Sequence, residues 1–233
     1  MHLLKKILIL YLCIICSVAF AADATPIRYV ALGDSYTIGI GAQMNESWPA
    51  VLTNRLQKKG FQVELVSNLG HDGWTSQNLI DGELPQLQQL KPDFVTLLIG
   101  VNDWVQGVDV STFKNHLEYI LDELLKAFHN SKRILIVTIP DFSVTPTGKL
   151  FAHGRDITLG IKGFNQIIFK EAQSRGLKVV DVFSLSQTMG QDYSLVAQDG
   201  LHPSAKEYAQ WADLIEPAWE SLGLEDIGRL IKR

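Results

Sequence analysis

Short apolar runs alternate with longer amphipathic stretches from residue 27 onward. The runs are rich in Val and Ile and are bounded by Gly, Pro, Asn or Asp, as buried strands usually are. They predict five strands, at Ile27–Leu32, Val63–Val66, Phe94–Ile99, Ile134–Ile139 and Val179–Val182.

The stretches between these runs repeat their apolar residues at helical spacing. They predict helices at Trp48–Lys59, Ser76–Leu90, Thr112–Phe128, Ile157–Ser174 and Pro203–Leu222. Alternation of strands and helices favours a parallel sheet with helices on both faces. The predicted fold class is therefore α/β, a three-layer α/β/α sandwich around a five-stranded parallel sheet. No repeat or linker interrupts the pattern, which predicts one domain over residues 25–223 and a tail over residues 224–233.

Glycine and proline residues lie at or near the ends of the predicted helices. Gly60 and Gly176 each stand between a helical stretch and a strand, where a left-handed cap residue is wanted. Pro49 and Pro203 fit the first turn of a helix, where a missing N–H costs nothing. Pro217 lies inside the last helical pattern and predicts a kink or an early stop. On that helix the aromatic stripe that contains Trp211 and Trp219 is interpreted as core packing.

The first residues differ from the rest of the chain. Lys5 and Lys6 precede an apolar run over residues 7–18, and small residues follow up to Ala21. This pattern predicts a signal peptide over residues 1–21 that is cleaved near Ala21, and therefore export to the periplasm or the medium. An uncleaved membrane anchor is the alternative, but the run is shorter than the roughly 20 residues that a spanning helix needs.

Composition narrows the classes of function. Both cysteines, Cys13 and Cys16, lie in the predicted signal peptide, so the mature chain is expected to use no disulfide and no thiol chemistry. The net charge of −4 becomes about −6 when Lys5 and Lys6 are removed with that peptide. A net-acidic chain without basic clusters is a poor partner for nucleic acid. The sequence carries no signal for the oligomeric state.

A candidate nucleophile follows the first predicted strand. The strand stops at Gly33 and delivers Asp34 and Ser35 to what should be an exposed turn, at the sheet edge where parallel α/β proteins place their sites. A serine is a weak nucleophile by itself. It needs a general base, an acid that orients the base, and donors for an oxyanion.

The stretch DGLHP at 199–203 offers the acid and the base together. A turn of three residues lets the Asp199 carboxylate reach one imidazole nitrogen of His202 and leaves the other nitrogen free to accept a proton from Ser35. In isolation the stretch also fits a simple turn, with Asp199 as a cap and His202 as a surface residue.

Two further loops offer oxyanion donors. Gly73 lets its backbone N–H approach a substrate closely, and the side chain of Asn102 supplies a second N–H. The Ser35 backbone N–H would be a third. Taken alone, Gly73 fits an ordinary turn and Asn102 fits a turn or a helix entry.

Other chemistries are poorly supported. The glycines near Ser35 form neither GxGxxG nor GxxxxGK[ST], and the histidines show no HExxH or comparable spacing, so neither a cofactor nor a metal is predicted. A non-catalytic ligand-binding protein on the same fold stays open as an alternative.

The joint occurrence of these blocks resembles a known family. GDS at 33–35, the loop at 68–73, GVND at 100–103 and DGLHP at 199–203 resemble the four signature blocks of SGNH (GDSL-type) hydrolases. The likeness covers roughly residues 27–220. It implies the flavodoxin-like fold of that family and hydrolysis of carboxylic esters, and it is nearest to small secreted or periplasmic esterases with lysophospholipase or thioesterase activity.

The resemblance also implies roles. Ser35 is the implied nucleophile, His202 the general base and acid, and Asp199 its orienting partner; Gly73 and Asn102 join Ser35 in the oxyanion hole. Gly70 is the alternative to Gly73. The implied substrate is a small-molecule ester, with a lysophospholipid and a thioester as candidates, and transient contact with lipid is expected. A carbohydrate O-acetylesterase is the alternative function.

Two expectations concern the pocket itself. Apolar residues on strand-end loops are candidates for an acyl groove: Trp74, Val105, Phe142 and Leu150. The long connection over residues 141–155 is a candidate flap over the site.

Overall fold

Five parallel strands form one sheet, in the order β2-β1-β3-β4-β5, in a computed structural model that describes residues 25–224. The strands are β1 (Ile27–Gly33), β2 (Val63–Asn68), β3 (Phe94–Leu98), β4 (Ile134–Val137) and β5 (Lys178–Val180). The predicted fold class is confirmed, and each strand lies within two residues of its predicted bounds. The predicted signal peptide lies outside the described residues, as does the predicted tail beyond Leu224.

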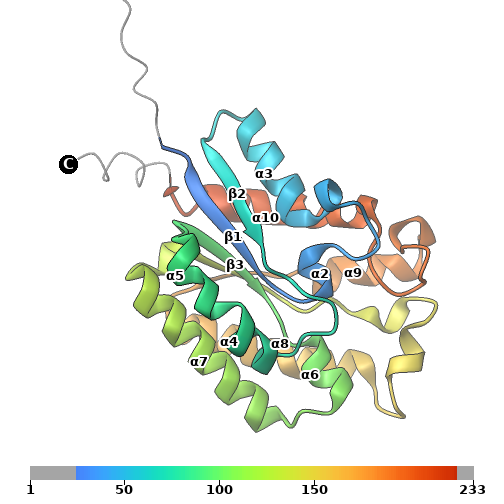
Figure 1. Cartoon of the computed structure of the whole chain (residues 1–233). Helices are drawn as coiled ribbons and strands as arrows, with labels where there is room; N and C mark the ends of the chain where they lie inside the picture. The colour runs from blue at the N-terminus through green and yellow to red at the C-terminus, as the bar shows by residue number, and fades with distance from the viewer. Residues whose placement is uncertain (1–24, 225–233) are drawn as a thin grey trace, which may run out of the picture.

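Helices cover both faces of the sheet (Figure 1). The α-helices are α2 (Ser35–Ile38), α3 (Trp48–Lys58), α4 (Ser76–Gly82), α5 (Leu87–Leu90), α6 (Val101–Gln106), α7 (Val110–Phe128), α8 (Ile157–Ser174), α9 (Phe183–Ser186) and α10 (Ala205–Glu220). Short 3₁₀ helices are η1 (Met44–Glu46), η2 (Leu84–Gln86), η3 (Ser131–Arg133), η4 (Phe142–Val144), η5 (Gly148–Phe151), η6 (Gln187–Gly190) and η7 (Tyr193–Leu195).

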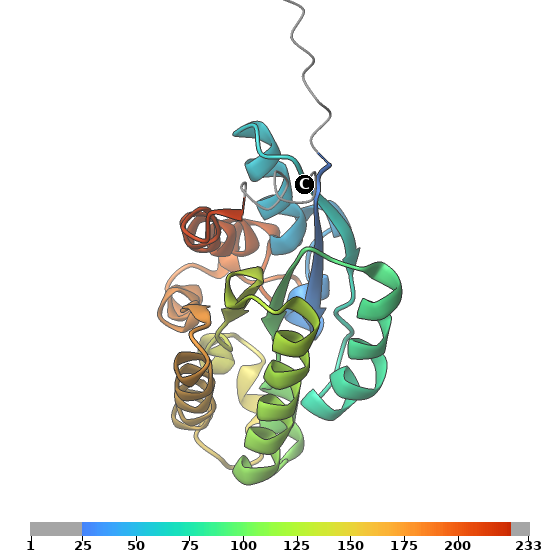
Figure 2. The ribbon, with the colours of Figure 1, turned by 90° about the vertical axis from the view of Figure 1, so that its left-hand side faces the viewer.

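The two helical layers are built from different parts of the chain. Helices α3 and α10 lie together on one side of the sheet, and α4, α5 and α7 lie on the other, as Figures 1 and 2 both show. Helix α8 packs beside α7 through the stacked rings of Phe113 and Phe164, whose centroids are 4.4 Å apart. No helix within residues 25–224 is long and apolar enough to cross a membrane.

The core follows from the position of each strand in the sheet. Strands β3 and β4 are buried along their whole length and β1 nearly so, because they are central and covered on both faces. Strands β2 and β5 are sheet edges and are only partly buried. The aromatic stripe of α10 is buried core, as predicted, and includes Trp211 and Trp219.

Three predictions about helix ends have clear outcomes. Gly60 and Gly176 have φ of 93° and 64°, which confirms the left-handed caps. The single helix predicted over Ser76–Leu90 is wrong: α4 ends at Gly82, and η2 and α5 follow, because Pro85 cannot donate to a continuing helical ladder. Pro203 was expected to open the last helix, but the cap is Ser204.

Pro203 instead lies before that cap, in an isolated antiparallel bridge with Val196. Helix α10 runs through Pro217 and ends at Glu220.

Candidate active site

The first strand delivers Ser35 to the carboxyl edge of the sheet. β1 ends at Gly33, Asp34 caps the following helix, and Ser35 is the first residue of α2. The predicted exposed turn is wrong in one respect: Ser35 is only 4% exposed, because a helix rather than an open loop follows the strand. What remains accessible borders a cavity of about 270 Å³.

Asp34 belongs to the fold beneath this cavity. One carboxylate oxygen accepts the Tyr36 N–H at 3.0 Å, which caps α2, and the other oxygen has no hydrogen-bond partner among residues 25–224. The side chain is fully buried. Burial raises the pKa of Asp34 well above its usual value, and nearby Asp103 and Asp72 raise it further, against the hydrogen bond from Tyr36.

Asp199 and His202 form a pair within one turn. The Nδ1 of His202 donates to Oδ2 of Asp199 at 2.6 Å. The other oxygen, Oδ1, accepts the N–H groups of Leu201 at 2.8 Å and His202 at 3.0 Å. Partial burial raises the pKa of Asp199, but these hydrogen bonds outweigh burial and hold the pKa below its usual value. Asp199 is therefore ionised at neutral pH and fixes the imidazole tautomer.

The turn that carries this pair is held at its base. The Ala197 N–H donates to the His202 carbonyl at 2.8 Å, and the Ser204 N–H donates to the Leu195 carbonyl at 2.7 Å. The ring of Tyr36, next to Ser35, meets the His202 ring edge-on with centroids 5.8 Å apart. Packing therefore joins α2 to a turn that lies far away in the sequence.

Both predicted oxyanion loops reach the same cavity. Gly73 has a left-handed φ of 75°, and a Cβ added there would meet nothing within 4 Å. Asn102 stands in the first turn of α6, and its Nδ2 donates to the Trp74 carbonyl at 2.9 Å. An amide has two N–H groups, so one anchors the side chain and the other is left for a ligand.

The two candidate glycines differ in their packing. Gly70 lies under α2, where an added Cβ would come within 2.6 Å of the Ile38 nitrogen and 2.7 Å of the Asp34 carbonyl oxygen. Gly73 borders the cavity and Gly70 does not.

The cavity brings together four of the five predicted site residues, Ser35, Gly73, Asn102 and His202; the fifth, Asp199, reaches it through its bond to His202. The remaining lining is mostly apolar: Tyr36, Asp72, Val101, Val105, Phe142, Phe151 and Leu201.

Two of the four residues predicted for an acyl groove line this cavity, Val105 and Phe142. The other two do not. Leu150 is 74% exposed, and its neighbour Phe151 takes the expected place. Trp74 stacks on His71, with centroids 3.9 Å apart, and an added Cβ at Gly82 would collide with its ring.

The connection over residues 141–155 holds two short 3₁₀ helices, η4 and η5. Thr147 bonds the Gly200 carbonyl through both its N–H and its hydroxyl, each at 2.9 Å, so the connection contacts the turn of Asp199 and His202. Arg155 donates to the carbonyls of Trp104 and Val105. The segment is thus tied to two sides of the cavity.

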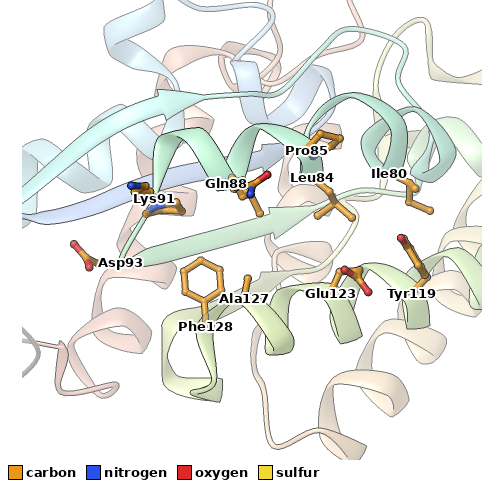
Figure 3. A pocket seen from close by; sticks show the side chains of 12 residues that line it. Ile80, Leu84, Pro85, Gln88, Lys91, Asp93, Tyr119, Glu123, Ala127 and Phe128 are labelled. Carbon is orange, nitrogen blue, oxygen red and sulfur yellow. The ribbon is translucent and has the colours of Figure 1, made fainter.

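A second hollow of about 660 Å³ lies between α5 and α7, away from these residues (Figure 3). It is larger than the cavity beside Ser35, but its lining holds no serine, threonine, cysteine or histidine; its polar members are Gln88, Lys91, Asp93, Tyr119 and Glu123. Within residues 25–224 no group of three or more His, Cys, Asp or Glu side chains is placed to bind a metal ion.

Sequence reasoning missed the residues that support the oxyanion loops. Asp103 is buried and accepts both the N–H and the hydroxyl of Ser76, the first residue of α4. Burial raises the pKa of Asp103, while its bonds from Ser76 lower it. In the sequence Asp103 directly follows Asn102 and Ser76 lies three residues after Gly73, but no local pattern shows that these two side chains meet.

Comparison with known proteins agrees with this geometry. A model of the GDSL-like lipase/acylhydrolase family matches residues 31–210. The chain is 26% identical over 136 residues to an arylesterase of Vibrio mimicus, which covers 58% of this chain and 64% of that protein, so the match spans less than two thirds of the relative. It is 23% identical over 196 residues to esterase TesA of Pseudomonas aeruginosa, with 83% and 86% of the two chains covered.

Among solved structures, a lipase/acylhydrolase from Enterococcus faecalis superposes with a TM-score of 0.68 at 23% identity, with 84% of this chain and 95% of that chain covered. At this identity the superposition shows the fold alone. The family match is broader evidence, because it runs from β1 into α10 and spans every block that borders the cavity. The chain therefore belongs to the GDSL-like lipase/acylhydrolase family of carboxylic ester hydrolases.

Proposed function

We propose that this hydrolase works through an acyl-enzyme on Ser35. His202 accepts the hydroxyl proton while the Ser35 oxygen attacks the ester carbonyl, and Asp199 stabilises the imidazolium that forms. The carbonyl electron pair moves onto oxygen, where the N–H groups of Ser35 and Gly73 and the Asn102 amide would stabilise it. The intermediate collapses as His202 returns the proton to the leaving alcohol.

Deacylation reverses these steps with water in place of the alcohol. His202 takes a proton from the water, the hydroxide attacks the acyl carbon, and the acid leaves as the Ser35 oxygen regains its proton. The observation that carries the proposal is the meeting of Ser35 and His202 at one cavity while Asp199 holds His202 at 2.6 Å.

We also propose that the substrate is a small ester with an apolar group. The cavity of about 270 Å³ is small and its walls include Phe142, Phe151 and Leu201. A lysophospholipid or an acyl thioester would place one part of its chain there and the rest outside, in transient contact with lipid. Export after cleavage near Ala21 is part of the same proposal. An acetylated sugar is the alternative substrate.

The test is hydrolysis of p-nitrophenyl acetate, without added metal and with a chelator present. The wild-type protein should turn over the ester and Ser35→Ala should not. Normal turnover by Ser35→Ala would overturn the serine mechanism. A series of acyl chain lengths, together with a lysophospholipid, an acyl thioester and an acetylated xylan, would then rank the substrate classes.

A further inference from the structure

The loop that carries Gly73 has little packing of its own around that glycine. Gly73 is exposed, and an added Cβ would meet no atom within 4 Å. The Trp74 N–H closes a turn to the His71 carbonyl at 3.4 Å, which is a long hydrogen bond. An N–H donor on such a loop stabilises an oxyanion only when its direction is fixed in advance. Contacts from elsewhere must therefore hold the loop.

Helix α6 supplies those contacts from three residues. Asn102 donates to the Trp74 carbonyl at 2.9 Å, and Gln106 donates to the Gly73 carbonyl at 3.2 Å. The two peptide units that follow Gly73, on either side of the Trp74 Cα, are thus held by one helix. The same helix carries Asn102, the other predicted donor, so the contacts fix the two donors relative to each other.

The third contact is buried. Asp103 Oδ2 accepts the Ser76 N–H at 2.8 Å, and Oδ1 accepts the Ser76 hydroxyl. Both side chains are fully buried. His116 of α7 approaches the same hydroxyl, with its Nδ1 2.9 Å from Ser76 Oγ. Because the Ser76 proton points to Asp103, its oxygen accepts the proton on His116 Nδ1.

Capping of α4 does not by itself account for this cluster. Thr75 already caps the helix, through a reciprocal pair of bonds with Asn78. Asp103 is neither on α4 nor near it in the sequence; it follows Asn102 on α6. The cluster therefore joins the end of the Gly73 loop to the helix that carries Asn102.

We propose that Asp103, Ser76 and Gln106 are positioning residues that hold Gly73 and Asn102 at the separation an oxyanion requires, with His116 orienting the Ser76 hydroxyl. This set is named the oxyanion clamp. The inference rests on the proposed serine mechanism, and it adds residues that touch neither the substrate nor the triad.

Gln106 gives the cleanest test because it is exposed, so its replacement should not unfold the protein. Gln106→Met keeps the length and loses the donor; kcat should fall by about threefold to tenfold with KM nearly unchanged, since one hydrogen bond is removed. Gln106→Lys keeps a donor and should restore most of kcat. Gln77→Ala is the matched control, because Gln77 is an exposed glutamine whose side chain, within the described part of the chain, bonds only Asp81.

Ser76→Ala removes the centre of the clamp and should lower kcat by about 10- to 100-fold, as misplacement of a catalytic group does. Ser47→Ala is its control: that hydroxyl belongs to a buried residue but bonds only the Met44 carbonyl.

Phenylboronic acid supplies a second readout, because it forms a tetrahedral anionic adduct on an active-site serine. For the clamp variants its Ki should rise in proportion to the loss of kcat, while the fraction of molecules that react with an active-site titrant stays at one. An unchanged boronate Ki in Gln106→Met and Ser76→Ala would overturn the clamp.

A loss of active-site titre without a change in Ki for the remaining molecules would show a purely structural role. If Ser35→Ala retained activity, the proposed function itself would fail, and that outcome is read from a different variant.

Discussion

Two turns at the carboxyl edge of the sheet share one hydrogen-bond pattern, but the pKa values of their aspartates are shifted in opposite directions. In each, an aspartate accepts the N–H two residues ahead: Asp34 from Tyr36 at 3.0 Å and Asp199 from Leu201 at 2.8 Å. The second oxygen of Asp199 accepts the Nδ1–H of His202, and the pKa of Asp199 is lowered. The second oxygen of Asp34 has no partner within the described chain, and burial raises its pKa.

The difference bears on which aspartate the proposed triad uses. Sequence proximity favours Asp34, which stands beside Ser35. The environment favours Asp199, because only a partly solvated carboxylate with several donors stays charged and can stabilise an imidazolium. The four predictions that follow test this contrast, from the largest expected effect to the smallest.

Asp199→Asn should give the largest effect. The amide keeps the size of the side chain but no longer favours the tautomer with a proton on His202 Nδ1, so kcat should fall by about 10⁴-fold. The measurement is kcat for p-nitrophenyl acetate, with far-ultraviolet circular dichroism as the control for folding. A fall of less than tenfold would remove Asp199 from the triad.

The glycines that flank the two turns should differ in their tolerance of a side chain. A Cβ at Gly33 would come within 2.1 Å of the Leu98 carbonyl oxygen, so Gly33→Ala should lower the free energy of unfolding by about 3 kcal/mol or more. At Gly200 the nearest atom is 3.0 Å away, and the left-handed φ of 72° should cost about 1–2 kcal/mol in Gly200→Ala. Urea unfolding measures both, and equal losses would contradict the contrast.

Glu207 tests whether burial raises the pKa of a carboxyl group in this protein, as it does for Asp34. Burial raises the pKa of Glu207 from 4.5 to about 7, against the bond from Trp211. The folded state then binds more protons than the unfolded state between these values, so stability is lost as pH rises through that window.

Glu207→Gln removes this titration. Its free energy of unfolding, relative to wild type, should rise by up to about 3 kcal/mol from pH 4.5 to pH 8. Urea unfolding at several pH values measures the difference, and a difference independent of pH would show that Glu207 titrates normally.

Asp34→Asn should have the smallest effect on catalysis. The amide oxygen still accepts the Tyr36 N–H, and no charge that the reaction uses is lost, so kcat should change by less than about tenfold. The same assay as for Asp199→Asn applies. A loss near 10⁴-fold would reverse the roles given to the two aspartates.

Much of the fold could be predicted because the central strands are continuous apolar runs. β3 and β4 are buried at every residue, so their hydrophobicity marks them without any knowledge of the neighbours. Helix α6 was missed for the opposite reason. It follows Gly100, which provides no capping side chain, and its first turn contains the polar pair Asn102 and Asp103 that also fits a turn.

The pairing of Asp199 with His202 could be predicted because it is local. Asp199 and His202 lie in one turn, so their spacing alone brings them together. The pocket walls were harder, because adjacent residues of a 3₁₀ helix face different ways: Phe151 lines the cavity and Leu150 is exposed. The clamp depends on contacts between distant segments, such as His116 with Ser76, which no local pattern contains.

The edge-on contact between Tyr36 and His202 spans most of the chain, and Ser35 and His202 are 167 positions apart in the sequence. During synthesis the proposed nucleophile therefore emerges long before the proposed base, and an incomplete chain should show no esterase activity. Recovery of esterase activity during refolding should likewise require the last helix and its preceding turn to dock beside α2. The order of the chain thus determines when esterase activity can first appear.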